Sequence, residues 1–155
     1  MLKFRKALSK DCELYYEWTN DPEVRKYSYK SEDISFENHC RWFESKLKSN
    51  DTILLVFSNE EDENVGQVRI ESKENEAIIG ISIDSKFRGM GLAKEMLIES
   101  SAFYLKSYPQ NKIFAFVKKD NFASYKSFLS AGYKLFEECE VETIPSYKLT
   151  IELNF

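Results

Sequence analysis

Histidine, cysteine and proline are scarce in this chain, which has one, three and three of them among 155 residues. The cysteines (Cys12, Cys40 and Cys139) are odd in number, far apart along the chain and not spaced like metal ligands, so we expect reduced thiols and no metal site. No apolar run approaches the roughly 20 residues that a membrane-spanning helix needs, and residues 1–8 lack the features of a signal peptide. These absences predict a cytoplasmic protein without a membrane segment.

An excess of either charge is also missing. The chain carries 22 basic and 26 acidic side chains, a net charge of −4, and the two signs are interspersed. Neither a broad nucleic-acid footprint nor a polybasic membrane-binding face follows from this pattern. With 43% hydrophobic residues, a chain of this length can bury one sizeable core, so we predict a single domain over residues 1–155. The sequence leaves the oligomeric state open, a homodimer included.

Glycine is rare as well, and two of the five glycines stand close together, at Gly89 and Gly91. The β-branched run at residues 78–83 predicts a buried strand before them, and the apolar residues after them recur at helical spacing up to Leu105. A glycine turn between a strand and a helix lets several backbone N–H groups point at one phosphate. Arg88 adds a positive charge, so the sequence predicts an anion-binding loop.

This loop resembles the pyrophosphate loop of the GCN5-related N-acetyltransferases, which has Arg or Gln, two residues, Gly, one residue, and Gly or Ala. Arg88, Gly91 and Ala93 match that pattern. The segment at residues 121–133 resembles a later motif of the family, in which Asn opens a helix that ends in Gly and an aromatic residue. Two motifs in the right order argue against a chance match.

The resemblance implies an α/β fold with a central, mixed, mostly antiparallel sheet of about six or seven strands, flanked by about four helices. It also implies acetyl-CoA as the cosubstrate, no metal, and direct acetyl transfer to an amine without an acyl-enzyme. Main-chain groups of the central strand would hold the pantetheine arm, and the loop would hold the pyrophosphate. The residues expected to bind acetyl-CoA are Ile81, Ile83, Arg88, Gly89, Met90, Gly91, Leu92, Ala93, Asn121, Ser124 and Phe128.

The chain departs from the family at one catalytic position. Many members carry a tyrosine seven residues after the motif Asn, where it protonates the leaving thiolate, but here that residue is Phe128. Tyr125, one helical turn earlier, is the alternative proton donor, and simple packing of its ring is the competing interpretation. The candidates for the general base are Glu76, at the start of the central strand, and Ser82, through a bound water. A solvated glutamate is the simpler interpretation of Glu76.

We expect the acceptor amine at an aromatic and polar front segment, residues 18–42. This segment is similar to that of family members that acetylate a nucleotide-linked amino sugar, such as the pseudaminic acid enzymes. Comparable segments occur in relatives that modify ribosomal proteins or aminoglycosides, and a non-catalytic acyl-CoA sensor is a further alternative. The predicted substrate-binding residues are Trp18, Arg25, Tyr27, His39 and Trp42, with core packing as an equal alternative for Trp18.

Hydrophobic periodicity and turn residues divide the chain into elements. The expected strands cover residues 3–8, 52–58, 65–71, 77–83, 113–117, 133–140 and 147–153, with a connection at 143–146. The expected helices follow Ser9, begin at Pro22, follow Ser35, and cover residues 94–105 and 121–130.

Overall fold

Strands and helices are interspersed along the computed structural model, which describes residues 1–153. In chain order the elements are β1 (Lys3–Lys6), a 3₁₀ turn (Ser9–Asp11), α1 (Cys12–Thr19), α2 (Pro22–Tyr27), α3 (Phe36–Lys48), β2 (Thr52–Ser58), β3 (Asn64–Lys73), β4 (Glu76–Ile83), a second 3₁₀ turn (Ser85–Phe87), α4 (Leu92–Ser107), β5 (Lys112–Lys118), α5 (Phe122–Ser130), β6 (Lys134–Val141) and β7 (Ile144–Glu152).

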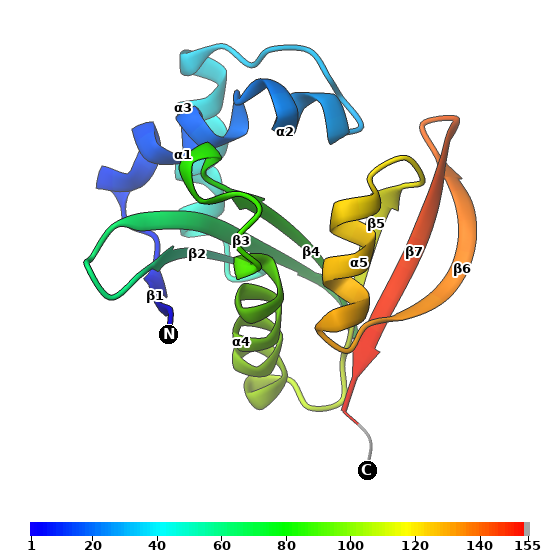
Figure 1. Cartoon of the computed structure of the whole chain (residues 1–155). Coiled ribbons are helices and arrows are strands. Elements are labelled where there is room, and N and C mark those ends of the chain that lie inside the picture. Colours follow the sequence, from blue (N-terminus) through cyan, green and yellow to red (C-terminus); the bar gives the residue numbers. More distant parts are fainter. Residues whose placement is uncertain (154–155) are drawn as a thin grey trace.

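The seven strands form one sheet in the order β1-β2-β3-β4-β5-β7-β6. All neighbouring pairs are antiparallel except β4 and β5, which run parallel because α4 crosses between them. Figure 1 shows α4 and α5 in front of the sheet, with α1 and α2 along its upper edge. The predicted fold class, a mixed and mostly antiparallel sheet flanked by helices, is confirmed.

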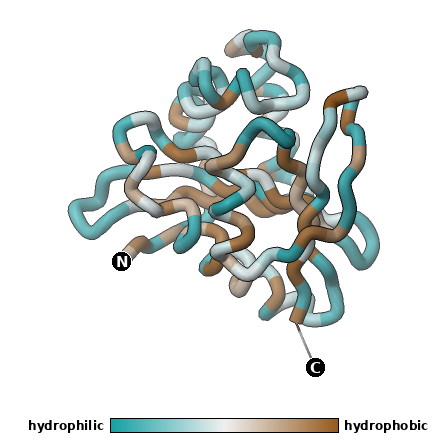
Figure 2. Tube along the Cα trace, turned by 45° about the vertical axis from the view of Figure 1, so that its right-hand side comes forward, coloured by the Kyte–Doolittle hydropathy of each residue, from teal (hydrophilic) through white to brown (hydrophobic). Residues whose placement is uncertain are grey.

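Alternating side chains of the sheet build a core on each face. On β2, Leu55 and Phe57 join the larger core under α4 and α5, whereas Leu54 and Val56 join the smaller core under α1 and α3. Each face therefore needs its own layer of helices. Figure 2 shows the hydrophobic stretches in the strands and a hydrophilic turn between β2 and β3.

Side-chain caps begin three helices. Asp21 accepts from the backbone N–H groups at the start of α2, Ser35 from Asn38 at 3.2 Å, and Asn121 from Ser124 at 3.3 Å. The predicted starts at Pro22, Ser35 and Asn121 are therefore confirmed. The start predicted at Ser9 is displaced, because residues 9–11 form a 3₁₀ turn and α1 begins only at Cys12.

The last hairpin differs from the prediction. Its turn is the pair Glu142 and Thr143, whose φ angles are +51° and +66°, and β7 already begins at Ile144. Two positive φ angles suit a two-residue hairpin turn, because the twist of such a turn matches that of the strands. Pro145 therefore lies inside β7, where it pairs with Glu140 of β6 beyond the end of β5, so its missing N–H costs no ladder bond.

Candidate active site

The central strands β4 and β5 diverge soon after they begin. They pair only at Glu76–Lys112, Ala77–Ile113 and Ile78–Phe114, although β4 continues to Ile83 and β5 to Lys118. The carboxyl ends of the two parallel strands are therefore separated, and beyond Ile78 the backbone groups on this side of β4 have no strand partner among residues 1–153.

The residues that face this gap follow from the alternation of hydrogen bonds. The N–H of Asp84 donates to the carbonyl of Val65 on β3 at 2.8 Å, so even-numbered residues of β4 direct their backbone groups toward β3. The N–H and C=O groups of Ile81 and Ile83 then point into the gap. This is the position expected for the main-chain groups that hold the pantetheine arm.

The anion loop follows directly at the end of β4. Gly89 and Gly91 have φ angles of +76° and +75°, a conformation that disfavours other residues, and Gly91 is the N-cap of the 16-residue helix α4 without a side-chain cap. A Cβ added at either glycine would meet nothing within 4 Å. The N–H groups of Leu92 and Ala93 thus open the helix beside free space, and Met90 is exposed at the tip of the loop. This arrangement fits a pyrophosphate.

Arg88 lies in the loop, but its charge is already compensated. Its guanidinium donates to Asp21 at 2.6 Å and lies 3.1 Å from a carboxylate oxygen of Glu23, both on the front segment. Burial opposes ionisation of Asp21, but the hydrogen bonds from Arg88 and from the backbone at Val24 outweigh it and lower the pKa of the carboxyl group. In this structure Arg88 therefore ties α2 to the loop.

Three further contacts close the front segment over the gap. The indole N–H of Trp18 donates to Asp84 at the end of β4, at 2.9 Å. The hydroxyl of Tyr29 donates to Ser146 on β7 at 2.7 Å, and the ammonium of Lys118, at the end of β5, donates to a carbonyl of α2 at 3.1 Å. The front segment thus bridges the two halves of the sheet at the open end of the gap.

Two of the predicted substrate contacts make hydrogen bonds inside the protein. His39 is buried, with 1% of its surface exposed, and its Nε2 lies 2.9 Å from the carbonyl oxygen of Cys12. Burial lowers the pKa of His39, so the ring packs in the smaller core as a neutral group. Arg25 donates to the carbonyls of Thr19 and Lys30 at 2.7 and 2.8 Å, so its guanidinium links two parts of the front segment. Neither side chain is free for an acceptor.

The other predicted contacts are more varied. Trp18 is buried and holds Asp84, as the packing alternative required. Trp42 is half-buried, with the guanidinium of Arg69 on β3 lying 5.5 Å from its ring centre. Tyr27 is half-buried near the end of α2, with the ammonium of Lys26 at 5.1 Å. Tyr27 and Trp42 therefore remain the accessible aromatic residues of the predicted set.

Of the residues on α5 predicted to contact the cosubstrate, one caps the helix and another packs in the hydrophobic core. Asn121 is the N-cap and accepts from the N–H of Ser124, whereas Phe128 is buried against Tyr133 and makes no surface for a ligand. This burial does not fit the predicted cofactor contact of Phe128. Tyr125 is half-buried, and its ring packs at a tilt against Tyr147 of β7, with 4.4 Å between the ring centres.

Of the two predicted general bases, Glu76 lies far from the gap between β4 and β5. It is exposed at the closed end of the β4–β5 pair, opposite Lys112, and Ser82 lies six positions further along the strand, about 20 Å away. Ser82 is half-buried on β4 beside the gap, and its hydroxyl accepts from the amide of Gln67 at 3.0 Å. Sequence reasoning missed Gln67, because nothing in its local sequence shows that β3 sets it opposite Ser82.

Two cysteines far apart in sequence meet in space. The sulfur atoms of Cys12 on α1 and Cys40 on α3 are 3.2 Å apart, and both residues are free thiols. Burial, together with the hydrogen bond to Cys40, raises the pKa of Cys12 to about 11, so it is a poor nucleophile at neutral pH. Within residues 1–153, no group of three His, Cys, Asp or Glu side chains is placed to hold a metal ion.

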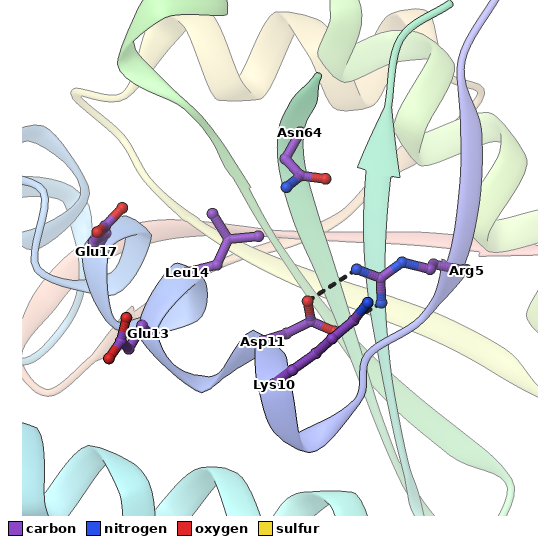
Figure 3. Close-up of a pocket in the computed structure, with 7 residues that line it drawn as sticks. All are labelled: Arg5, Lys10, Asp11, Glu13, Leu14, Glu17 and Asn64. Carbon is purple, nitrogen blue, oxygen red and sulfur yellow. Dashed lines mark hydrogen bonds and ion pairs between the residues drawn. The ribbon is translucent and has the colours of Figure 1, made fainter. Parts of the chain in front are cut away.

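A surface pocket of about 400 Å³ lies between β1, the first 3₁₀ turn, α1 and the start of β3 (Figure 3). Its centre is the ion pair of Arg5 and Asp11, at 2.7 and 2.9 Å, with Lys10, Glu13 and Glu17 around it. It shares no residue with the loop or the gap. Among the described residues, no helix has the length and apolarity to cross a membrane.

The chain resembles several known proteins. A curated, uncharacterised protein of Methanocaldococcus jannaschii is 28% identical over 135 residues, which are 84% of this chain but only 27% of that protein, so the chain spans about a quarter of its length. Among solved structures, spermidine N-acetyltransferase from Vibrio cholerae in complex with CoA and spermine has a TM-score of 0.86 at 16% identity, over 97% of this chain and 94% of that one.

Two other structures have the same fold. An aminoglycoside acetyltransferase in complex with coenzyme A and kanamycin has a TM-score of 0.81 at 14% identity, over 98% of this chain and 95% of that one. A domain from M. jannaschii has a TM-score of 0.83 at 21% identity, over 99% of each chain. A family model described as an acetyltransferase (GNAT) domain matches residues 1–134. The chain therefore belongs to the GNAT family of acetyltransferases.

Proposed function

We propose that the chain transfers the acetyl group of acetyl-CoA directly to the primary amine of a small molecule. The observation that carries this proposal is the gap between β4 and β5, which runs into the anion loop. The free backbone groups of Ile81 and Ile83 suit the amides of pantetheine, and the start of α4 suits the pyrophosphate. The gap and the adjoining loop thus offer hydrogen-bond partners to both the pantetheine arm and the pyrophosphate of acetyl-CoA.

The chemistry needs little beyond positioning. The neutral amine attacks the thioester carbonyl carbon, the carbon–sulfur bond breaks, and the thiolate of CoA takes up a proton. We assign that proton to Tyr125, since it carries a phenolic hydroxyl group on α5 one turn before Phe128, which has none. The high pKa of the Cys12 thiol supports transfer without an acyl-enzyme at that residue.

For the acceptor we propose an amino sugar linked to a nucleotide. Support comes from the mouth of the gap, where Lys118 meets the backbone of α2: Tyr27 and Tyr29 offer aromatic faces there, and Lys26 and Lys30 offer cations for a diphosphate. Arg25 and His39 no longer support it, because both are engaged inside the protein. The structural relatives bind spermine and kanamycin, so polyamines and aminoglycosides are the competing acceptors, together with peptide amines.

A CoA-release assay tests the proposal with four acceptor classes: amino-sugar nucleotides, polyamines, aminoglycosides and peptide amines. We expect fastest release with an amino-sugar nucleotide, and a decrease on Lys30→Ala that added salt mimics. Preference for another class would overturn the acceptor but not the activity. CoA binding without release for any amine would favour the acyl-CoA sensor. A cytoplasmic location remains part of this proposal.

A further inference from the structure

In the part of the chain that the structure describes, one buried side-chain polar atom lacks a hydrogen-bond partner. Gln67 on β3 is 5% exposed; its amide N–H donates to the hydroxyl of Ser82 at 3.0 Å, whereas its carbonyl oxygen Oε1 has no hydrogen-bond partner within residues 1–153. Turning the amide over exchanges the two ends without removing the problem. Burying an unsatisfied amide end costs free energy that an apolar side chain of the same shape would avoid. The buried amide of Gln67 therefore calls for a hydrogen-bond partner from outside the chain, which is a donor in the orientation that the structure has.

The orphan atom lies next to the reaction site. Gln67 stands directly opposite Ser82 in the β3–β4 register, and Ser82 lies on the part of β4 that has left β5. The neighbouring Ile81 and Ile83 turn their side chains to the larger core, so the side chains of Gln67 and Ser82 lie on the opposite face, where the front segment closes the gap.

We propose that Gln67 and Ser82 together hold a water molecule that accepts the proton released by the acceptor amine. The water donates to Oε1 of Gln67, which leaves its own oxygen free to take a proton. As the nitrogen–carbon bond forms, the amine nitrogen becomes positively charged; its proton passes to this water and on to solvent, while the thiolate of CoA is protonated separately. Gln67 acts through the water as a positioning residue. This inference rests on the proposed function.

Kinetics on the amine that the wild-type protein acetylates best provide the first test. Gln67→Met keeps the shape but removes both polar ends, so we expect kcat to fall about 10- to 100-fold with an unchanged KM for acetyl-CoA. Gln67→Glu keeps an acceptor oxygen and should retain most of the turnover. Ser82→Ala should lose activity like Gln67→Met, and the double variant should lose little more. Ser101→Ala, which removes a buried hydroxyl bonded to Tyr133, is the matched control and should keep kcat.

A crystal structure of the CoA complex provides the second test. We expect an ordered water within hydrogen-bond distance of Oε1 in the wild-type protein and none in Gln67→Met, with equal CoA affinity for both. This inference is overturned if Gln67→Met turns over at the wild-type rate, or if the crystal structure of the wild-type complex shows no water at Oε1. Either result leaves the proposed function intact. A wild-type protein that acetylates no amine overturns the proposed function and this inference with it.

Discussion

At Gly91, one added methyl group should weaken CoA binding strongly while lowering the stability of the fold only slightly. Its φ of +75° makes alanine there adopt a left-handed conformation, at about 1–2 kcal/mol of stability. The new Cβ meets no atom within 4 Å, so no clash adds to this cost. For a chain of this length we expect the melting temperature of Gly91→Ala to fall by about 2–8 °C.

The methyl group would instead occupy the open space at the start of α4, where we expect a phosphate to approach the backbone. Losing one hydrogen bond to a charged group, about 1.5–3 kcal/mol, weakens binding about 10- to 150-fold. Titration calorimetry with CoA should show this loss for Gly91→Ala, and a larger one for Gly91→Val.

Gly132 supplies the matched control. It has a φ of +101° after the end of α5, and an added Cβ there would touch only a side-chain atom of Ile151, at 3.5 Å. Gly132→Ala should lose similar stability and keep the CoA affinity of the parent. Equal affinities in Gly91→Ala and the parent, or equal losses in both variants, would refute the assignment of the pyrophosphate to this loop.

Three further predictions concern the acid, the ion pair and the histidine. Tyr125→Phe should lower turnover about 10²-fold at unchanged CoA affinity; turnover at the parent rate would show that another group protonates the thiolate. Asp21→Asn still caps α2 but removes one of the two carboxylate charges beside Arg88, with Glu23 remaining at 3.1 Å, so CoA should bind about 2- to 5-fold more tightly in calorimetry, and unchanged or weaker binding would count against this role. Because burial lowers the pKa of His39, the unfolded chain binds more protons than the folded one near pH 6, and stability should decrease as the pH falls from 7 to 5. Urea unfolding at both pH values should show this decrease, and a His39→Gln variant with the same decrease would contradict it.

Local patterns predicted much of this molecule. The strand run before Gly89, the helical spacing after Gly91 and the caps at Ser35 and Asn121 are properties of neighbouring residues, and the structure has the predicted elements at these places. The family resemblance rested on the same local segments, and the family model confirms it. Boundaries moved by a few residues where a 3₁₀ turn or a hairpin turn replaced the expected connection.

Contacts between distant segments could not be predicted in this way. His39 has a pKa suited to proton transfer, yet α1 and α3 pack around it, and no periodicity reveals that its Nε2 meets a carbonyl 27 residues away. Arg25 carries the positive charge that a diphosphate would need, but its guanidinium donates hydrogen bonds to nearby backbone carbonyls. Glu76 stands on the predicted strand, and only the point at which β4 leaves β5 shows that it lies at the closed end. The unpartnered oxygen of Gln67 likewise depends on tertiary burial.

The most direct test of direct acetyl transfer is mass spectrometry of the complete reaction mixture. The protein is incubated first with acetyl-CoA alone and then with the preferred amine, and the masses of protein, amine and CoA are followed together. Our account predicts an unmodified protein mass throughout, with acetylated amine and free CoA appearing in equal amounts only after the amine is added. An acetylated protein that loses its acetyl group on addition of the amine, or CoA that stays acetylated with every amine, would contradict it.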